Sequence, residues 1–339
     1  MGDLASRVIA MKQAGASWGD IAAAFPDVNR ETLRGKYRRW KAKQEPPTCV
    51  TTGIRADEPL DEEEIWQRAV RKWKRAEKLI ERRGNQTLAF SHGPVCIAFF
   101  ADLHLGDDDV DYPRIEREIQ IVRDTPGMYA GLVGDALANF ILAVFAAVRF
   151  DASFTIAEEW ALVKRVLRLL GPKLRIAVGG NHDWWTKKMA GIDYFREVVA
   201  GISPDVLYDA DDCELTIQVG AVEFPTRIRH KWRGSSIYNP SHGIERAAKW
   251  DQNFVLGVGA HTHACGVARD FNVGGRQGLA VMCGAYKRDD DYARRGGFPK
   301  PNNSTAIAVV FDDETQSMTG FDNLEFAAQF MRSMYQQGG

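Results

Sequence analysis

The stretch CIAFFADLHLGD, residues 96–107, begins as an apolar strand and ends in acids and an imidazole. Five apolar residues open it, as expected of a strand that passes through a protein core. Asp102 and His104 follow, with one residue between them. Residues at positions i and i+2 just past a strand can reach the same side, so both side chains can serve one site. The stretch therefore predicts a core strand that carries polar groups at its carboxyl end.

Four later segments repeat this pattern of an apolar run followed by polar residues. They end in Gly134-Asp135, in Gly180-Asn181-His182-Asp183, in His230, and in the pair His261 and His263. In α/β sheets, sites form outside the carboxyl ends of strands, where loops bring distant residues together. We expect the five strand ends to converge on one crevice rich in Asp, Asn and His, the oxygen and nitrogen donors of a two-metal site.

Taken in order, the motifs D-x-H, G-D, G-N-H-D, a lone His and H-x-H resemble those of the calcineurin-like metallophosphoesterases, over about residues 95–311. The resemblance implies an α/β fold in which a two-sheet β sandwich is flanked by helices. It places helices near residues 136–149 and 156–170, and late strands within residues 305–321. A small all-α domain is expected in front of this fold.

The resemblance also implies a role for each motif residue. Seven side chains would hold two divalent metal ions: Asp102, His104 and His263 the first ion, Asn181, His230 and His261 the second, and Asp135 both. His182 would be catalytic, because it could stabilise developing charge or protonate the leaving oxygen after attack by a hydroxide that bridges the ions. His242 is the alternative to His230, since His230 lacks the glycine that usually follows this ligand.

These residues predict a dinuclear-metal-dependent phosphoesterase. Mn²⁺ is the expected ion, with Fe, Zn or Ni as alternatives, because first-row metals overlap in affinity. Asp135 is followed by ALANF rather than by the arginine-bearing sequence of Ser/Thr protein phosphatases, which favours phosphodiesters. We expect a phosphodiesterase or nuclease that acts on DNA or another nucleic acid. Two alternatives stay open: a phosphomonoesterase or small-nucleotide phosphodiesterase with a non-catalytic N-terminal interaction domain, and a DNA-binding regulator whose phosphoesterase domain is inactive.

The amino-terminal part of the chain is basic, although the whole chain has a net charge of −1. Residues 1–88 contain 18 basic and 13 acidic side chains, and the remainder contains 26 and 32. Residues 1–45 are expected to form three short helices in the order of a helix-turn-helix, with Ser17 and Asn29 as caps of the second and third. This order is similar to segments of phage terminase and transposase-like proteins.

The third of these helices is the predicted nucleic-acid interface. Its basic side chains would contact phosphates, and the predicted binding residues are Arg30, Arg34, Lys36, Arg38 and Arg39. The alternative is a solvated helical face of a small protein-interaction bundle.

A linker, a further helix and a tail complete the predicted organisation. Residues 46–60 are a linker rich in Pro, Thr and Gly, and residues 61–84 should form a basic helix that packs on the next domain rather than extends the nucleic-acid surface. The metallophosphoesterase domain should cover residues 85–325, and the tail residues 326–339. The loop 286–303 is expected either to rim the site or to be an ordinary solvated loop.

Composition sets the expected compartment. No apolar run approaches the roughly 18 residues of a membrane span, and no basic-then-apolar leader opens the sequence. The five cysteines are scattered without a CxxC pair, which is typical of reduced thiols. The sequence therefore predicts a cytoplasmic protein that binds nucleic acid and no membrane, and it indicates no particular protein partner.

Overall fold

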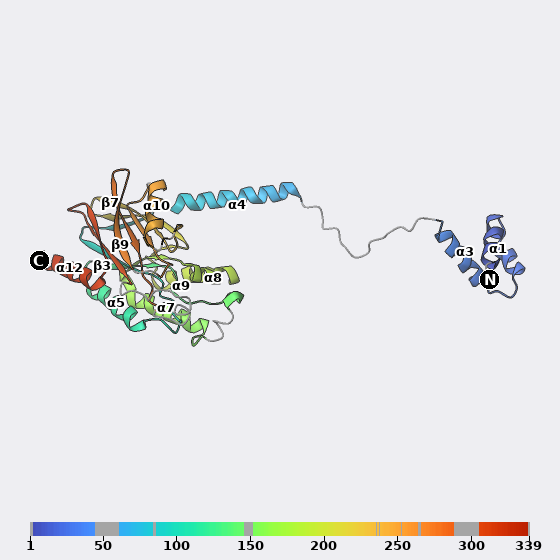
Figure 1. Cartoon of the computed structure of the whole chain (residues 1–339), viewed down its shortest axis with the longest axis horizontal. Helices are drawn as coiled ribbons and strands as arrows, with labels where there is room; N and C mark the ends of the chain where they lie inside the picture. Colours follow the sequence, from blue (N-terminus) through green and yellow to red (C-terminus); the bar gives the residue numbers. More distant parts are fainter. Residues whose placement is uncertain are drawn as a thin grey trace. The chain divides into compact units, whose positions relative to one another are not determined.

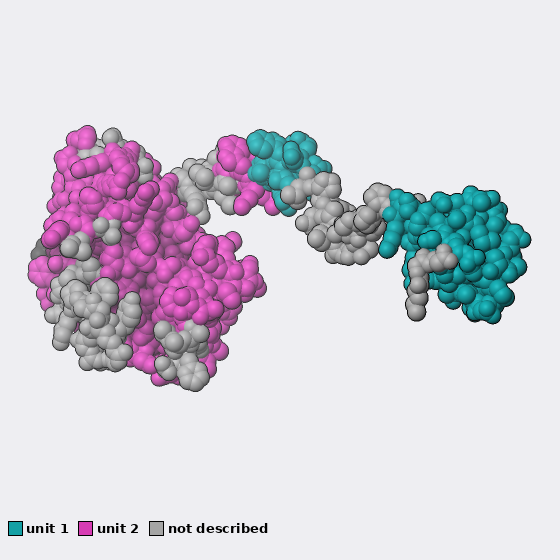
Figure 2. Space-filling view, turned by 45° about the vertical axis from the view of Figure 1, so that its right-hand side comes forward, with its two compact units in different colours: residues 1–71 teal, residues 72–339 magenta. Residues whose placement is uncertain are grey.

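The computed structural model describes residues 3–44, 61–83, 86–145, 152–234, 236, 238–251, 253–263, 266–287 and 305–337. It divides the chain into two compact units, Met1–Arg71 and Lys72–Gly339, drawn in teal and magenta in Figure 2. Each unit is described by itself. The predicted linker 46–60 and the loop from residue 288 to 303 lie outside the described residues.

The three predicted helices of the first unit are confirmed (Figure 1). They are α1 (Asp3–Gln13), α2 (Trp18–Ala24) and α3 (Arg30–Ala42). The Ser17 side chain accepts a hydrogen bond from the Asp20 amide, and the Asn29 side chain accepts one from the Glu31 amide, so both caps lie where the sequence predicts them. The helices enclose a small core formed by Val8, Ile21, Phe25 and Leu33.

A fourth helix, α4 (Glu62–Arg83), spans the division between the units. Its first turn is acidic, as the helix dipole favours. The sequence predicts that its apolar face packs on the next domain. Trp66 is 65% exposed and Trp73 is 62% exposed. The packing of α4 on the next domain stays a prediction.

Six strands form the first sheet of the second unit, in the order β12-β11-β2-β3-β4-β5. Their bounds are β2 (Val95–Phe100), β3 (Met128–Val133), β4 (Leu174–Val178), β5 (Leu207–Asp209), β11 (Ile307–Asp312) and β12 (Ser317–Phe321). Strands β2 to β5 run parallel, while β11 pairs antiparallel with both β2 and β12. The parallel strands end at one edge of the sheet, and the motif residues follow β2, β3 and β4 at that edge.

The second sheet also has six strands, in the order β1-β6-β7-β8-β10-β9. Their bounds are β1 (Gln86–Phe90), β6 (Asp212–Val219), β7 (Val222–Arg229), β8 (Leu256–Gly259), β9 (Val267–Val273) and β10 (Arg276–Met282). Strands β7 and β8 are parallel neighbours, so His230, His261 and His263 also follow strand ends at one edge. Both sheets are mixed, since each contains antiparallel pairs as well.

The two sheets share one core. Ile97 and Phe99 of the first sheet belong to the same buried cluster as Ile217 and Val258 of the second. Helices cover the other face of the first sheet: α5 (Tyr112–Asp124), α7 (Ile156–Leu170), α9 (Tyr194–Ile202) and α12 (Leu324–Gln337). β2 is therefore buried on both faces, which explains its unbroken apolar run. The predicted α/β fold, a two-sheet β sandwich flanked by helices, is confirmed (Figure 1).

Two of the predicted local elements differ in their outcome. The helix predicted over residues 156–170 is confirmed as α7, which begins at Ile156 with Thr155 as its cap and ends at Leu170. The helix predicted near residues 136–149 is wrong over 136–142, and only a short turn, Ala143–Phe145, is helical among its described residues. Leu105 donates its amide to the Ala136 carbonyl, and Ala138 donates to the Leu105 carbonyl, so this backbone pairs with the loop after β2 instead of with itself.

Two further findings concern the chain end and the membrane. The C-terminal segment that the sequence sets apart as a tail forms most of α12, whose Ala327, Ala328 and Met331 are buried in the core. Among the described helices, none has both the length and the apolar character needed to cross a membrane.

The burial of α12 leads to a prediction about the stability of the second unit. Met331 is 0% exposed and Met334, on the same helix, is 38% exposed. Met331→Ala should lower the free energy of unfolding of the second unit by about 2–5 kcal/mol, because removal of a buried methionine side chain leaves a cavity. Met334→Ala should change it by less than about 1 kcal/mol. Chemical denaturation of the full chain measures both, and equal losses would show that α12 is not docked as described.

Candidate metal centre

The loops after five strands bring the seven predicted ligands to one place. Strand β2 leads to Asp102 and His104, β3 to Asp135, and β4 to Asn181, the first residue of α8 (Asn181–Ala190). Strand β7 leads to His230, and β8 leads to His261 and His263. The site thus lies where the carboxyl ends of strands from both sheets meet, as is usual for α/β sheets.

Asp102, His104 and His263 form one group of possible metal ligands. The Nε2 atoms of His104 and His263 lie 3.0 Å apart. The Asp102 Oδ1 atom lies 3.7 Å from His104 Nε2 and 3.5 Å from His263 Nε2. Two donors that each bind an ion at about 2.1 Å are about 3 Å apart, so this group has the spacing of a coordination shell.

Asp135, His230 and His261 form a second group with the same kind of spacing. His230 Nε2 lies 3.0 Å from Asp135 Oδ2 and 3.2 Å from His261 Nδ1. Asp135 also belongs to a third group, with His104 and His182. The two main groups adjoin, since His230 Nε2 is only 3.8 Å from Asp102 Oδ1. Asp135 therefore contacts ligands of both groups, which is the position expected of a bridging carboxylate.

Buried acceptors without partners show that the donor set fits cations. Asp102 Oδ1 and Asn181 Oδ1 are buried and have no hydrogen-bond partner. An unsatisfied buried oxygen is costly, and a bound cation satisfies it. The site combines carboxylate, amide and imidazole donors, which suit divalent first-row metals. These residues fit divalent metal ions. The number of ions and their identity stay predictions of the sequence.

The backbone at the ligands is strained. Seven non-glycine residues of the described chain have positive φ, and five of them are predicted ligands: Asp102 (47°), His104 (45°), Asp135 (50°), His261 (76°) and His263 (50°). A left-handed conformation costs a non-glycine residue about 1–2 kcal/mol. Such residues cluster at functional sites, where the surrounding structure holds them in place.

Hydrogen bonds between the loops hold this conformation. The Asp102 amide donates to the Gly134 carbonyl, and the His104 amide donates to the Asp135 carbonyl, at 3.1 and 3.0 Å. The His261 amide donates to Asp102 Oδ2 at 2.9 Å. The loops after β2, β3 and β8 therefore fix one another through Asp102, His104, Asp135 and His261.

Glycine is required before two of the ligands. A Cβ atom on Gly134 would lie 2.5 Å from His230 Nδ1, and Gly134 has a φ of +82°. A Cβ on Gly180 would lie 2.2 Å from Asp135 Oδ1. Only glycine leaves room for these side chains at the two positions.

Two buried carboxylates dominate the electrostatics. Asp102 is 0% exposed and Asp135 is 1% exposed. Burial lowers the pKa of His230, but the negative charges of Asp135 and Asp102 outweigh it and raise that pKa to about 10. Burial likewise opposes ionisation of Asp135, yet His230 and its other histidine neighbours hold the pKa of Asp135 below its usual range. The centre thus favours positive charge, which is the condition for binding cations.

His182 is oriented by contacts on both sides of its ring. Its Nδ1 donates to the Ala138 carbonyl, which leaves Nε2 3.9 Å from Asp135 Oδ2. The Trp185 ring packs against the imidazole with centroids 4.0 Å apart, and the Phe140 ring meets it edge-on at 5.3 Å. Burial is the main cause that lowers the pKa of His182, to about 4.

Two residues that position the site were missed from the sequence. Asp183 is 4% exposed and accepts hydrogen bonds from the amides of Ala136 (3.0 Å) and Gly180 (2.8 Å), so it ties the loop after β3 to the loop after β4. Burial and the charge of Asp135 raise the pKa of Asp183 to about 7. Asp183 is the last residue of the GNHD motif and lies in the first turn of α8. This position was the signal in the sequence that could have identified it as a residue that bonds backbone amides.

Asn139 is the second missed residue. Its side chain donates to the His182 carbonyl and to Thr186 Oγ1, and its own amide donates to Glu159 Oε2 at 2.7 Å. It also has a φ of 48°. Asn139 and Glu159 are both buried and together support the His182 loop. Nothing in the local sequence distinguishes Asn139 from an ordinary loop residue.

The remaining predicted site residues lie elsewhere. His230 is 3% exposed within the metal centre, whereas its alternative, His242, is exposed at the start of α10 (His242–Asp251). The five predicted nucleic-acid-binding residues lie on α3, in the first unit. Arg34 and Arg38 both bond to Glu31, at 2.9 and 3.0 Å, while Arg30 and Arg39 are exposed.

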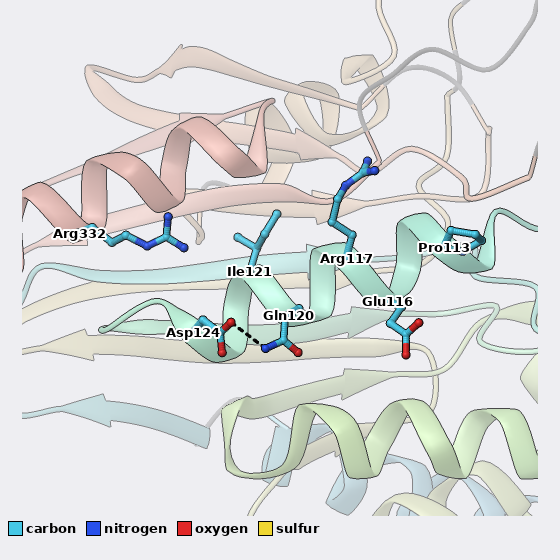
Figure 3. A pocket seen from close by; sticks show the side chains of 7 residues that line it. All are labelled: Pro113, Glu116, Arg117, Gln120, Ile121, Asp124 and Arg332. Atoms are coloured by element: carbon cyan, nitrogen blue, oxygen red, sulfur yellow. Dashed lines mark hydrogen bonds between the residues drawn. The ribbon is translucent and has the colours of Figure 1, made fainter.

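A hollow of about 520 Å³ lies along α5 and reaches α12 (Figure 3). None of the predicted ligands lines it. Its charged lining is mixed, with Glu116 and Asp124 beside Arg117 and Arg332. This surface therefore favours no single class of ligand.

Comparisons with known proteins reach only distant structures. No protein-family model matches the chain, and no curated protein does. Among solved structures, vacuolar protein sorting 29 from Cryptosporidium parvum is 15% identical over 68% of this chain and 99% of that one, with a TM-score of 0.34. The NAD nucleotidase NadN from Haemophilus influenzae is 8% identical over 68% of this chain and 49% of that one, with a TM-score of 0.37.

The calcineurin-like phosphoesterase YfkN from Bacillus subtilis is a further match. It is 11% identical over 72% of this chain and 97% of that one, with a TM-score of 0.35. Its name is that of the family which the motifs resemble. With TM-scores below 0.5, these likenesses carry no weight for what the chain binds or catalyses. The metal centre is supported by its own geometry.

The position of Asp135 between the ligand groups leads to a prediction about metal content. Asp135→Asn should reduce bound metal from about two ions per chain to one or fewer, because a bridging ligand contributes to both coordination shells. Asp322→Asn, at an exposed carboxylate of the same unit, should leave the metal content unchanged. Elemental analysis after loading with Mn²⁺ and desalting measures both. Full metal content in Asp135→Asn would remove Asp135 as the bridge.

Proposed function

We propose that this chain is a calcineurin-like metallophosphoesterase that hydrolyses phosphodiesters with two divalent metal ions, Mn²⁺ by preference. One observation carries the proposal: five strand ends deliver two adjoining groups of metal ligands that both contact Asp135. When bound, such ions polarise a phosphoryl oxygen and activate water for attack. Asp102, Asp135, His104 and His230 are buried, and buried charged groups are costly unless they are paired or bind a metal.

The protein groups around the centre supply orientation and proton transfer. Asp102 and Asp135 provide the negative charge that attracts the cations, and Asp183 keeps their loops in register. His182 stands beside the bridge with Nε2 toward it, so it is placed to hold or transfer a proton at an oxygen of the ester. Trp185 and Phe140 restrict the ring to this orientation.

Two features favour diesters of nucleic acid as substrates. The residues after Asp135, ALANF, provide no arginine to grip the dianion of a phosphomonoester. The first unit offers a basic helix, α3, on which Arg30 and Arg39 are exposed. Contacts of such side chains with phosphates bind nucleic acid regardless of sequence, and a tethered binding unit raises the local concentration of substrate.

The proposal is tested by activity on a panel of esters in the presence of Mn²⁺. The full chain should hydrolyse bis(p-nitrophenyl) phosphate and cleave plasmid, single-stranded or nicked DNA, and should turn over p-nitrophenyl phosphate more slowly. Turnover of monoesters alone would establish a phosphomonoesterase instead. Absence of any turnover by the metal-loaded protein would favour a DNA-binding regulator with an inactive domain.

His182 gives the sharpest substitution in this test. His182→Ala should reduce kcat for the diester by about 10²–10⁴-fold, the usual contribution of a positioned acid or base. Metal content should stay unchanged, since His182 is not among the predicted ligands. His92→Ala, at an exposed histidine of the same unit, is the matched control and should retain full activity. An active His182→Ala enzyme would remove this residue from the chemistry.

The role of α3 is tested separately by nucleic-acid binding. The double variant Arg30→Gln with Arg39→Gln should weaken binding of fluorescent DNA by the full chain. It should also reduce the slope of log affinity against log salt by about 2, because about 0.9 of slope is lost for each phosphate contact. Lys12→Gln is the control, since this lysine lies on α1 rather than on α3, and its ammonium group is held by the Ala16 carbonyl and over the Trp18 ring. A slope that does not change would show that α3 does not contact phosphates.

A further inference from the structure

Lys287 follows β10 at a backbone position that is tied to the metal centre. The Tyr286 amide donates to the Asp102 carbonyl at 3.2 Å, and the Tyr286 carbonyl accepts the Asp111 amide at 2.9 Å. Lys287 itself forms an antiparallel bridge with Val110. The segment Tyr286–Lys287, which follows β10, is therefore held against the loop that carries Asp102 and His104.

Alternation of the chain directs Lys287 away from the core. Tyr286 is 1% exposed, and its hydroxyl donates to the buried carboxylate of Glu118, which also accepts from Thr305. Neighbouring residues of an extended segment point to opposite sides. With Tyr286 fixed toward the helices, the side chain of Lys287 points to the opposite side, where the site loops lie.

The surroundings of the ammonium group place it beside the first group of ligands. Its Nζ lies 2.6 Å from Asp107 Oδ2 and 5.9 Å from the centre of the Phe140 ring, which in turn packs against His182. A basic side chain thus stands between Asp107 and the Phe140 ring that packs against His182.

In the ion pair between Lys287 and Asp107, a bound anion can take the place of the Asp107 carboxylate. The Lys287 side chain is 16% exposed and that of Asp107 is 14% exposed, so the pair is neither free in solvent nor fully enclosed. Asp107 also accepts the Asp109 amide at 3.2 Å, and it keeps this bond if the lysine moves. A lysine has a flexible stem, and its ammonium group can exchange a carboxylate for another oxyanion at short range.

We propose that Lys287 is a substrate-binding residue whose ammonium group binds an oxygen of the phosphate ester at the metal centre. Asp107 holds it there when no ester is bound. This inference rests on the proposed function and adds a positive group that the metal ligands themselves do not provide. The charge is supplied by a lysine after β10 rather than by an arginine after Asp135.

The test compares removal of the lysine with removal of its partner. Lys287→Gln should lower kcat/KM for bis(p-nitrophenyl) phosphate by about 10- to 100-fold, the usual effect of a charged hydrogen bond. It should also weaken binding of inorganic phosphate, measured by calorimetry on Mn²⁺-loaded protein, by a similar factor. Asp107→Asn should leave phosphate binding as tight as in the wild-type protein or tighter, because the Asp107 carboxylate then no longer competes with phosphate for the Lys287 ammonium group.

Three controls make the outcome decisive. Lys287→Arg keeps the charge and should recover most of the phosphate affinity. Lys173→Gln changes a lysine at the amino end of β4, the end opposite the site, where its ammonium group donates to the Thr125 carbonyl. It should change phosphate binding by less than about twofold, because this lysine does not lie at the metal centre. Metal content should be unchanged in Lys287→Gln, which separates loss of anion binding from damage to the centre.

Several results would overturn the inference. If Lys287→Gln and Asp107→Asn weaken phosphate binding equally, the ion pair is only structural. If Lys287→Gln impairs DNA cleavage but not turnover of the small diester, the lysine does not contact the ester at the centre. Unchanged phosphate binding in Lys287→Gln refutes the inference even when the proposed function holds. Failure of the unchanged protein to hydrolyse any ester refutes the proposed function, and calorimetry with phosphate still decides the role of the lysine.

Discussion

The constraint on which the second unit depends is the burial of two carboxylates side by side. Asp102 and Asp135 follow neighbouring parallel strands and are almost completely removed from water. Burying one unpaired charge is costly, and two like charges repel each other as well. Their negative charge raises the pKa of His230 to about 10, and the Asp102 Oδ1 atom has no hydrogen-bond partner. Divalent cations at the centre would relieve it.

The sandwich makes this arrangement possible because its interior is rigid. Strand β2 is packed on one face by the second sheet and on the other by helices, so the position of Asp102 is determined by two cores at once. Five ligands adopt left-handed backbone conformations, and cross-loop hydrogen bonds hold them. Strain of this kind persists only where the surroundings over-determine the conformation. A well-packed fold therefore supports a locally unfavourable site.

Anion recognition is divided between the two units in the proposed function. The metal centre and Lys287 would bind the phosphate that reacts, while α3 would bind phosphates elsewhere on a long substrate. On α3, Glu31 bonds to both Arg34 and Arg38, which leaves Arg30 and Arg39 as its exposed arginines without such a bond to Glu31. Binding at α3 would then raise the frequency of encounter without altering the chemistry.

The sequence pattern by itself determined the strand ends that carry polar residues and the caps at Ser17 and Asn29, while the two-sheet sandwich and the set of ligands followed from the resemblance of the motifs to a known family. Apolar runs that end abruptly in Asp, Asn or His mark strand ends, and parallel strands end together. It could not identify Asn139 as a support, because the His182 carbonyl and the Thr186 hydroxyl that Asn139 bonds lie more than 40 positions away in the chain. The long-range bond of Asp183 to the Ala136 amide was hidden for the same reason. The helix that the family resemblance implied over residues 136–142 does not form, because this backbone pairs with the loop around Leu105. Only the tertiary structure separated His230 from His242 and brought Lys287 beside Asp107, since such contacts depend on packing between distant segments rather than on local pattern.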